Sequence, residues 1–101
     1  MPSPTTIRRF ASIRKYVEAY DNRGDAWLAK GDLDRAIADY NEAILLNPKY
    51  ANSYFNRGVA REKKGSLQEA LADFETYSQL VPSDPDGRKS VERLRKELNA
   101  R

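Results

Sequence analysis

Residues 20–48 read YDNRGDAWLAKGDLDRAIADYNEAILLNP, and residues 54–82 read YFNRGVAREKKGSLQEALADFETYSQLVP. The two stretches are 34 residues apart, and their similarity predicts that the chain is built from a repeated unit. Aligned over the units 17–50 and 51–84, the sequence has 13 identical positions. A fixed period of about 20 to 50 residues is typical of stacked repeats, in which each unit buries its apolar face against its neighbours. In the first unit the identical residues are Tyr20, Asn22, Arg23, Gly24, Ala26, Lys30, Gly31, Leu33, Ala36, Ala38, Asp39, Leu46 and Pro48.

Each unit is predicted to form two helices. In the first unit, apolar residues recur at helical spacing from Tyr20 to Leu28, and Gly31 suits the left-handed conformation that follows a helix. Asp32 is suited to cap a second helix, which Pro48 ends because the residue before a proline avoids helical dihedrals. The second unit repeats this plan, and residues 66–69 fit a capping box.

Small residues recur at matching places in the two units. Gly24 and Gly58 lie inside the predicted first helices, where glycine is less favourable than alanine by about 1 kcal/mol. Ala36 and Ala70 lie on the predicted second helices. Their recurrence indicates that the two helices of a unit approach each other closely at these points.

The pattern resembles the tetratricopeptide repeat (TPR) family. The first unit gives Tyr20-x2-Arg23-Gly24-x2-Trp27, and the second departs from the family pattern at Arg61, where an aromatic residue is expected. Tyr77 departs as well, because the first unit has Ala43 there, and we expect it to push the next helix outward or to fill a gap beside it. The resemblance implies an all-α fold, a right-handed stack of antiparallel helical hairpins.

The predicted organisation has four parts. Residues 1–16 form a basic N-terminal extension that continues the first helix, and residues 17–50 and 51–84 form two TPR-like repeats. Residues 85–101 form a C-terminal capping helix with a narrow apolar stripe of Val91, Leu94 and Leu98. That stripe is too narrow for a membrane anchor.

The N-terminal extension suggests self-association. Phe10, Ile13 and Val17 continue the apolar spacing of the first helix backwards, to about residue 6. Two complete repeats are fewer than the three or so that a stack usually needs. We therefore expect either contact with a second chain through these three residues, or an extension that folds back on the stack or is loose.

Composition excludes several classes of protein. The chain of 101 residues has neither Cys nor His, which removes disulfides, thiolate and imidazole metal sites, and Ser-His-Asp triads. No stretch has the length and apolarity of a membrane span or a secretory signal, so the expected location is cytoplasmic, unless a signal was removed. We expect no cofactor, no metal ion and no catalytic residue.

The net charge of +3 conceals an uneven distribution. Residues 1–16 carry four basic and no acidic groups, and residues 17–50 carry four basic and seven acidic groups. The second unit is nearly balanced, whereas residues 85–101 carry six basic and three acidic groups. Two basic ends therefore flank an acidic middle, a pattern that suits either charge steering of a partner or ordinary solvation of surface helices.

The resemblance also implies a binding site. In TPR proteins the first helices of successive units line a concave groove that binds peptides or extended segments of other proteins. Aligned with this sequence, that groove would contain Glu18, Asp21, Asn22, Asp25, Asn52, Phe55, Asn56, Val59 and Lys63, with Leu28 and Glu62 beside them and Lys89 and Arg93 from the last helix.

The chemistry of these residues favours a basic partner segment. Glu18, Asp21 and Asp25 would form an acidic patch, and the amides of Asn22 and Asn56 suit a peptide backbone. One TPR subclass clamps the C-terminal carboxylate of chaperones with Lys, Asn and Arg. At four of those positions this chain has Asp21, Asp25, Asp86 and Ser90, and only Asn56 matches. We therefore expect no binding of an acidic chaperone peptide.

Three classes of function remain. The first is a non-catalytic protein-interaction module or scaffold. The second is a nucleic-acid-associated adaptor that uses the basic termini, with Phe10 and Tyr16 interleaved among Arg8, Arg9, Arg14 and Lys15. The third is an enzyme in which Glu18, Asp21 and Asp25 hold a divalent ion, which no phosphate loop or nucleophile supports.

Overall fold

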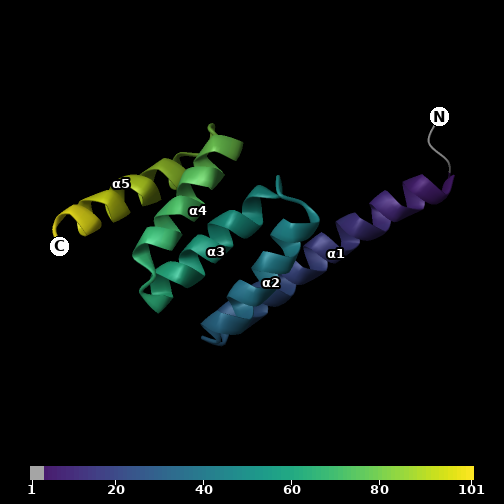
Figure 1. Cartoon of the computed structure of the whole chain (residues 1–101), viewed down its shortest axis with the longest axis horizontal. Coiled ribbons are helices and arrows are strands. Elements are labelled where there is room, and N and C mark those ends of the chain that lie inside the picture. The colour runs from purple at the N-terminus through teal and green to yellow at the C-terminus, as the bar shows by residue number, and fades with distance from the viewer. Residues whose placement is uncertain (1–3) are drawn as a thin grey trace.

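The computed structural model describes the backbone of residues 4–101 and the side chains of residues 12–101. Over this part of the chain the backbone forms five α-helices and no strand (Figure 1). They are α1 (Pro4–Ala29), α2 (Leu33–Leu46), α3 (Ala51–Lys64), α4 (Leu67–Leu80) and α5 (Pro85–Asn99).

The helices form a stack of hairpins. α1 packs on α2 and α3 packs on α4, while α2 contacts α3 and α4 contacts α5 (Figure 1). Short connections between successive helices bring them together as antiparallel neighbours. The predicted all-α fold is therefore confirmed.

α1 is much longer than the other helices. It has 26 residues, whereas α2, α3 and α4 have 14 each. Its first half extends beyond the rest of the stack, as the purple end of the ribbon shows (Figure 1). α1 thus includes most of the segment that the sequence separates as a basic extension.

The helix ends follow the sequence signals with one exception. Asp32 caps α2 by accepting a hydrogen bond from the backbone N–H of Arg35 at 3.2 Å. Gly31 and Gly65 have φ angles of 81° and 93°, as expected for the left-handed turn after a helix. The predicted capping box is wrong, because the side chain of Ser66 makes no cap bond and Glu69 pairs instead with Arg61 at 3.4 Å.

Glycines bring the two helices of each hairpin together. A Cβ atom on Gly24 would lie 2.6 Å from Cε1 of Tyr40, and one on Gly58 would lie 3.0 Å from Cε1 of Phe74. Both rings are buried between their helices. The close approach inferred from the recurring glycines is therefore confirmed.

The unusual Tyr77 fills a gap and does not displace the next helix. Its ring is buried against Gly87 of α5, where a Cβ atom would lie 2.8 Å away. The phenol donates a short hydrogen bond to Asp84, which also caps α5. This bond raises the pKa of Tyr77 to about 12 and lowers the pKa of Asp84.

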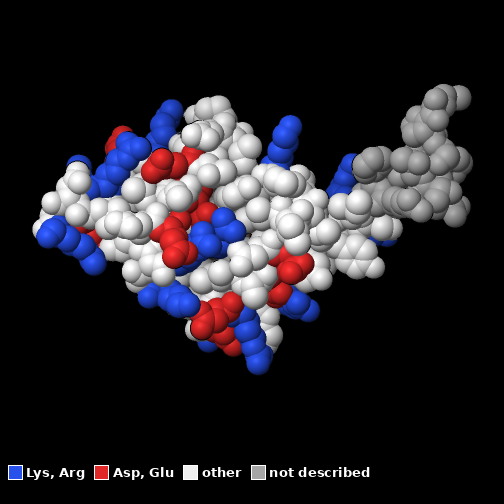
Figure 2. Space-filling model, viewed as in Figure 1, with Lys and Arg blue, Asp and Glu red and all other residues white. Residues whose placement is uncertain are grey.

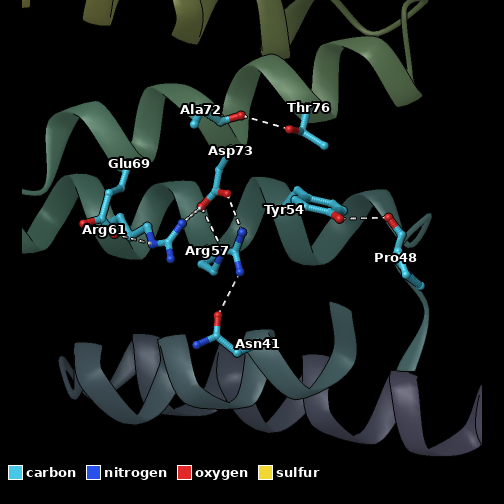
Figure 3. Close-up of polar contacts among 9 residues, drawn as sticks. All are labelled: Asn41, Pro48, Tyr54, Arg57, Arg61, Glu69, Ala72, Asp73 and Thr76. Carbon is cyan, nitrogen blue, oxygen red and sulfur yellow. Dashed lines mark hydrogen bonds and ion pairs between the residues drawn. The ribbon is translucent and has the colours of Figure 1, made fainter. Parts of the chain in front are cut away.

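An ion pair between an arginine and a buried aspartate recurs in both hairpins. Arg23 of α1 binds Asp39 of α2, and 34 residues later Arg57 of α3 binds Asp73 of α4, each at 2.7 Å. Arg61, which replaces the expected aromatic residue, gives Asp73 a second cation at 3.0 Å (Figure 3). Removing a partner from such a pair would leave a buried, uncompensated carboxylate, so the pairs fix how the hairpins close.

Among the side chains that the structure describes, buried residues form two clusters along the stack. Ala36, Tyr40 and Ala60 are fully buried where α2 meets α3. The second cluster joins α4 to α5, and its members are Leu67, Ala70, Phe74, Val91 and Leu94. Both predicted small residues of the second helices, Ala36 and Ala70, therefore lie in the core.

Replacing Gly24 by alanine tests the steric role of this glycine. We expect Gly24→Ala to lower the free energy of unfolding by about 1–3 kcal/mol, because the added methyl group overlaps the buried ring of Tyr40. Helix propensity alone predicts the opposite sign, a gain of about 1 kcal/mol. Urea unfolding measures the difference, and a more stable variant would contradict the account.

Candidate functional site

Polar contacts join α1 to α3 and α3 to α5. The surface of these three helices that carries the predicted groove residues, from Glu18 on α1 to Arg93 on α5, is called the odd-helix face. Asp21 of α1 accepts a hydrogen bond from the hydroxyl of Ser53 at 2.7 Å and one from the amide of Asn56 at 3.3 Å. At the other end, Arg93 of α5 donates two hydrogen bonds to Glu62 of α3, one of them at 2.9 Å. These contacts hold the helices that carry the predicted binding residues.

Asp21 is the most deeply placed carboxylate of this face. Its exposed fraction is 5%, and burial raises its pKa above the ordinary value of 3.8. The hydrogen bonds from Ser53 and Asn56 oppose that rise because they favour the charged form. Burial outweighs these hydrogen bonds, so the fold disfavours the ionised form of Asp21, while Ser53 and Asn56 reduce that penalty and join α1 to α3.

Asp25 and Glu18 keep their carboxylates at the surface. Asp25 is exposed and accepts a hydrogen bond of 2.6 Å from the hydroxyl of Tyr40, whose ring lies beneath α1. Burial and this bond raise the pKa of Tyr40, so the phenol stays a donor. Glu18 is exposed one turn before Asp21 and Asn22. The structure thus gives the three predicted acidic residues different environments.

The acidic residues act together on Tyr50. This tyrosine precedes α3 and is half-buried. Burial raises its pKa, and the negative charges of Asp21, Glu18 and Asp25 raise it further. The end of the face formed by α1 is therefore electrically negative.

The remaining predicted residues divide into exposed and packed side chains. Asn22, Asn52 and Lys63 are exposed. Phe55 and Val59 are half-buried and pack against the α4–α5 core, with the ring of Phe55 at 5.2 Å from Phe74 and 4.9 Å from Tyr77 in edge contacts. These two residues stabilise the floor of the face and leave only part of their surface for a ligand.

Basic groups gather at the α5 end of the face. Lys63 and Lys89 are exposed, and Arg93 is held by Glu62, which raises the pKa of Arg93. Figure 2 shows acidic and basic side chains next to one another over the body of the molecule. The odd-helix face is distinguished by acidic groups at one end and basic groups at the other.

The predicted self-association residues lie in unlike surroundings. Phe10 falls outside the described side chains, as do Arg8 and Arg9 of the predicted nucleic-acid contacts. Ile13 is 40% exposed, whereas Val17 is only 3% exposed and is covered by its own chain. A hollow of about 280 Å³ adjoins them, and its lining is Ile13, Arg14, Val17, Leu46, Asn47 and Tyr50.

Three contacts of the site were not expected from the sequence. They are the bonds from Ser53 to Asp21, from Tyr40 to Asp25, and from Arg93 to Glu62. Ser53 has no serine counterpart in the first repeat, so the repeat pattern does not reveal it. The aromatic position of Tyr40 indicates core packing, and only its hydroxyl, absent from Phe74, could have suggested the bond.

The described residues contain neither a metal-binding cluster nor a membrane-spanning helix. Within that part of the chain, no three acidic side chains come together in a way that could hold a metal ion. The helices described here also lack a segment with the length and apolarity that crossing a membrane requires.

Comparisons with known proteins identify the class of protein. The pairs of helices, glycine contacts and repeated ion pairs define a helical-repeat protein. A family model described as "TPR repeat" matches residues 24–65, and one described as "Tetratricopeptide repeat" matches residues 51–83. The chain belongs to the tetratricopeptide repeat family. No curated protein sequence matches it at a significant level.

Solved TPR structures are similar to the chain. The Arabidopsis OM64 TPR domain is 33% identical, with a TM-score of 0.77 over 80% of this chain and 67% of that domain. The first TPR of Spaghetti (RPAP3), bound to the HSP90 peptide SRMEEVD, is 28% identical, with a TM-score of 0.80 over 84% and 68%. The second TPR domain of human RPAP3, in complex with the HSP70 peptide SGPTIEEVD, is 32% identical, with a TM-score of 0.73 over 78% and 66%.

Replacing Ser53 by alanine tests the buried bond of Asp21. We expect Ser53→Ala to raise the pKa of Asp21 further and to reduce stability at neutral pH by about 1 kcal/mol, because the charged form loses a donor. Carboxyl chemical shifts during an NMR titration report the pKa, and urea unfolding reports the stability.

The sign of the pH dependence gives a second readout. Because the folded-state pKa of Asp21 lies above its unfolded value, stability from this group falls as pH rises through that interval. The stability difference between parent and Ser53→Ala should therefore shrink in acid, where the carboxyl is protonated in both. Ser83→Ala, at an exposed serine, is the control and should change neither quantity.

Proposed function

We propose that the chain is a non-catalytic interaction module whose odd-helix face binds an extended segment of another protein. The solved TPR domains with HSP90 and HSP70 peptides support the general class of partner. The observation that carries the proposal is the row of exposed polar side chains on helices that hydrogen bonds hold together.

Amides on the face suit an extended backbone. Asn22 of α1 and Asn52 of α3 are exposed, and each amide has both donors and acceptors. An extended segment has unpaired N–H and C=O groups along its length, which need such partners when they leave water. The side-chain amide of Asn56 donates one hydrogen bond to Asp21 and so orients that carboxylate. The rest of the amide would lie beside the bound segment.

Charge gives the bound segment a direction. Glu18 and Asp25, with Asp21 behind them, favour basic residues at the α1 end. Lys63 and Lys89 favour acidic residues at the α5 end. The partner segment that fits best therefore has lysine or arginine over α1 and acidic groups over α5.

Charge reversal at Glu18 tests this proposal. We expect a lysine-rich peptide to bind more tightly than a glutamate-rich peptide of equal length, and Glu18→Lys to weaken the lysine-rich peptide about threefold to tenfold. Isothermal titration calorimetry at low salt measures both affinities. Glu42→Lys, at an exposed glutamate on α2, makes the same change in net charge away from the face and should have little effect.

The chaperone peptide is the informative comparison. The aligned clamp positions hold Asp21, Asp25, Asp86 and Ser90, so we propose that SRMEEVD does not bind here as it does to the RPAP3 domain. Micromolar affinity for SRMEEVD that is lost in Asn56→Ala would contradict this. Equal affinities for lysine-rich and glutamate-rich peptides would contradict the preference for a basic segment at the α1 end of the face.

We also propose that the first half of α1 associates with a second copy of the chain. Ile13 and Leu46 are 40% and 38% exposed beside the hollow of about 280 Å³, so apolar surface is available there. Val17 contributes indirectly, because its side chain is already buried. Phe10, three residues before Ile13 in the chain, would extend the contact.

Light scattering after size-exclusion chromatography measures self-association. We expect the parent to have a mass above that of a single chain at high concentration, and the double variant Phe10→Ser, Ile13→Ser to return to the single-chain mass. A variant that keeps both the mass and the melting temperature of the parent would remove this proposal.

A further inference from the structure

The contact between α2 and α3 shows how one repeat receives the helix before it. Arg57 of α3 donates a hydrogen bond through Nη1 to the side-chain oxygen of Asn41 in α2 at 2.8 Å, and Tyr54 donates one to the carbonyl of Pro48 at 2.9 Å (Figure 3). Ser53 and Ala60 are fully buried beside them. α3 therefore packs against α2 and the turn after it through an arginine, a tyrosine and two small residues.

α1 carries the same residues one repeat earlier. Tyr16, Tyr20, Arg23 and Ala26 are identical to the residues 34 positions later, and Ala19 is the small counterpart of Ser53. The geometry repeats as well, because Arg23 lies 5.5 Å from the ring centre of Tyr20 and Arg57 lies 5.6 Å from that of Tyr54. We call this surface of α1 the leading edge.

On α1 these residues are open to solvent except Tyr20, which is half-buried like its counterpart Tyr54. The side chain of Arg23 is 62% exposed, compared with 15% for Arg57. Tyr16 is 61% exposed, and Ala19 and Ala26 are exposed where Ser53 and Ala60 are fully buried. A hollow of about 250 Å³ lies on the leading edge, and its lining is Tyr16, Ala19, Tyr20 and Arg23.

α1 and α3 share these residues, whereas α5 does not have them. α5 also receives a preceding helix, α4, but it does so with Gly87 and Val91 at the positions of Ser53 and Arg57. The surface that packs on the preceding helix thus differs between α3, which packs on α2, and α5, which packs on α4. Because α1 keeps the surface of α3, it is matched to a helix like α2.

We infer that the leading edge binds an amphipathic helix of a partner protein that has the chemistry of α2. Such a helix presents a side-chain oxygen to Arg23, as Asn41 does to Arg57, and an apolar residue one turn earlier, as Ile37 does. A further turn earlier it presents a carboxylate to Lys30, as Asp34 does to Lys64 at 2.6 Å. This site is separate from the odd-helix face, so either proposal can fail without the other.

A second copy of the folded chain does not offer this helix. The surface of α2 that carries Asn41 and Asp34 is already paired with α3 of its own chain. The corresponding position of α4 is Glu75, which pairs with Arg95 of α5 at 3.9 Å. Both second helices of a folded copy are therefore occupied, and the partner is a helix of another protein.

A helical peptide copied from α2 is the probe. The peptide spans residues 32–48 with Ala38→Lys, whose side chain is joined to Glu42 by a lactam, because both positions are exposed and the bridge reduces the entropy lost on binding. It is titrated into the ¹⁵N-labelled full chain. We expect amide shifts at Tyr16, Ala19, Tyr20 and Arg23.

Blocking variants define the site. Ala19→Arg places a long side chain on α1 at the position that corresponds to Ser53, which is buried in the α2–α3 contact. We expect this variant to weaken binding of the peptide about tenfold or more. Ala72→Arg makes the same substitution at an exposed alanine of α4 and should leave the affinity unchanged. A peptide that also carries Asn41→Arg should bind more weakly to the parent, because it opposes Arg23.

Three results would overturn the inference. The first is no shift at the leading edge at millimolar peptide, and the second is a shift that Ala19→Arg leaves unchanged. The third is a parent chain whose mass doubles in solution and whose dimer is lost in Ala19→Arg, which would assign the leading edge to a second copy. Thermal unfolding of Ala19→Arg checks that the exposed substitution leaves the fold intact.

Discussion

The contact between a glycine and an aromatic ring sets the spacing on which the rest of the structure depends. It occurs where Gly24 meets Tyr40 and where Gly58 meets Phe74, and Gly87 makes a third such contact with Tyr77. Close-packed interiors tolerate little change in volume, so each contact fixes how near one helix lies to the next. An Arg–Asp pair also joins the two helices of each hairpin, and Figure 3 shows the pair in the second hairpin.

The odd-helix face follows from this spacing. Gly24 sets how α1 lies on α2, and α2 packs on α3, so the carboxylate of Asp21 comes within hydrogen-bond distance of Ser53. Gly58 and Gly87 set α3 and α5 on α4, where Glu62 reaches Arg93. Tyr40 takes part both in helix packing and in the acidic surface, because its ring packs on Gly24 while its hydroxyl donates a hydrogen bond to Asp25. Packing and surface charge are therefore coupled through single side chains.

The repeat period made the fold and the glycine contacts predictable, since identical residues 34 positions apart must occupy like environments. Burial within the predicted groove was less predictable. Asp21 is buried, as is Val17 of the predicted self-association residues, and Phe55 packs on Phe74. These contacts depend on side chains that differ between the repeats. The capping box failed for a related reason, because Glu69 lies near enough to Arg61 to pair with it.

We propose that an extended partner segment binds to the odd-helix face and not to the surface of α2 and α4. Intermolecular NOEs between the labelled chain and a bound lysine-rich peptide test it most directly. The account predicts NOEs to the side-chain amides of Asn22 and Asn52, with the lysines near Glu18. NOEs confined to α2 and α4, with none to those amides, would contradict it.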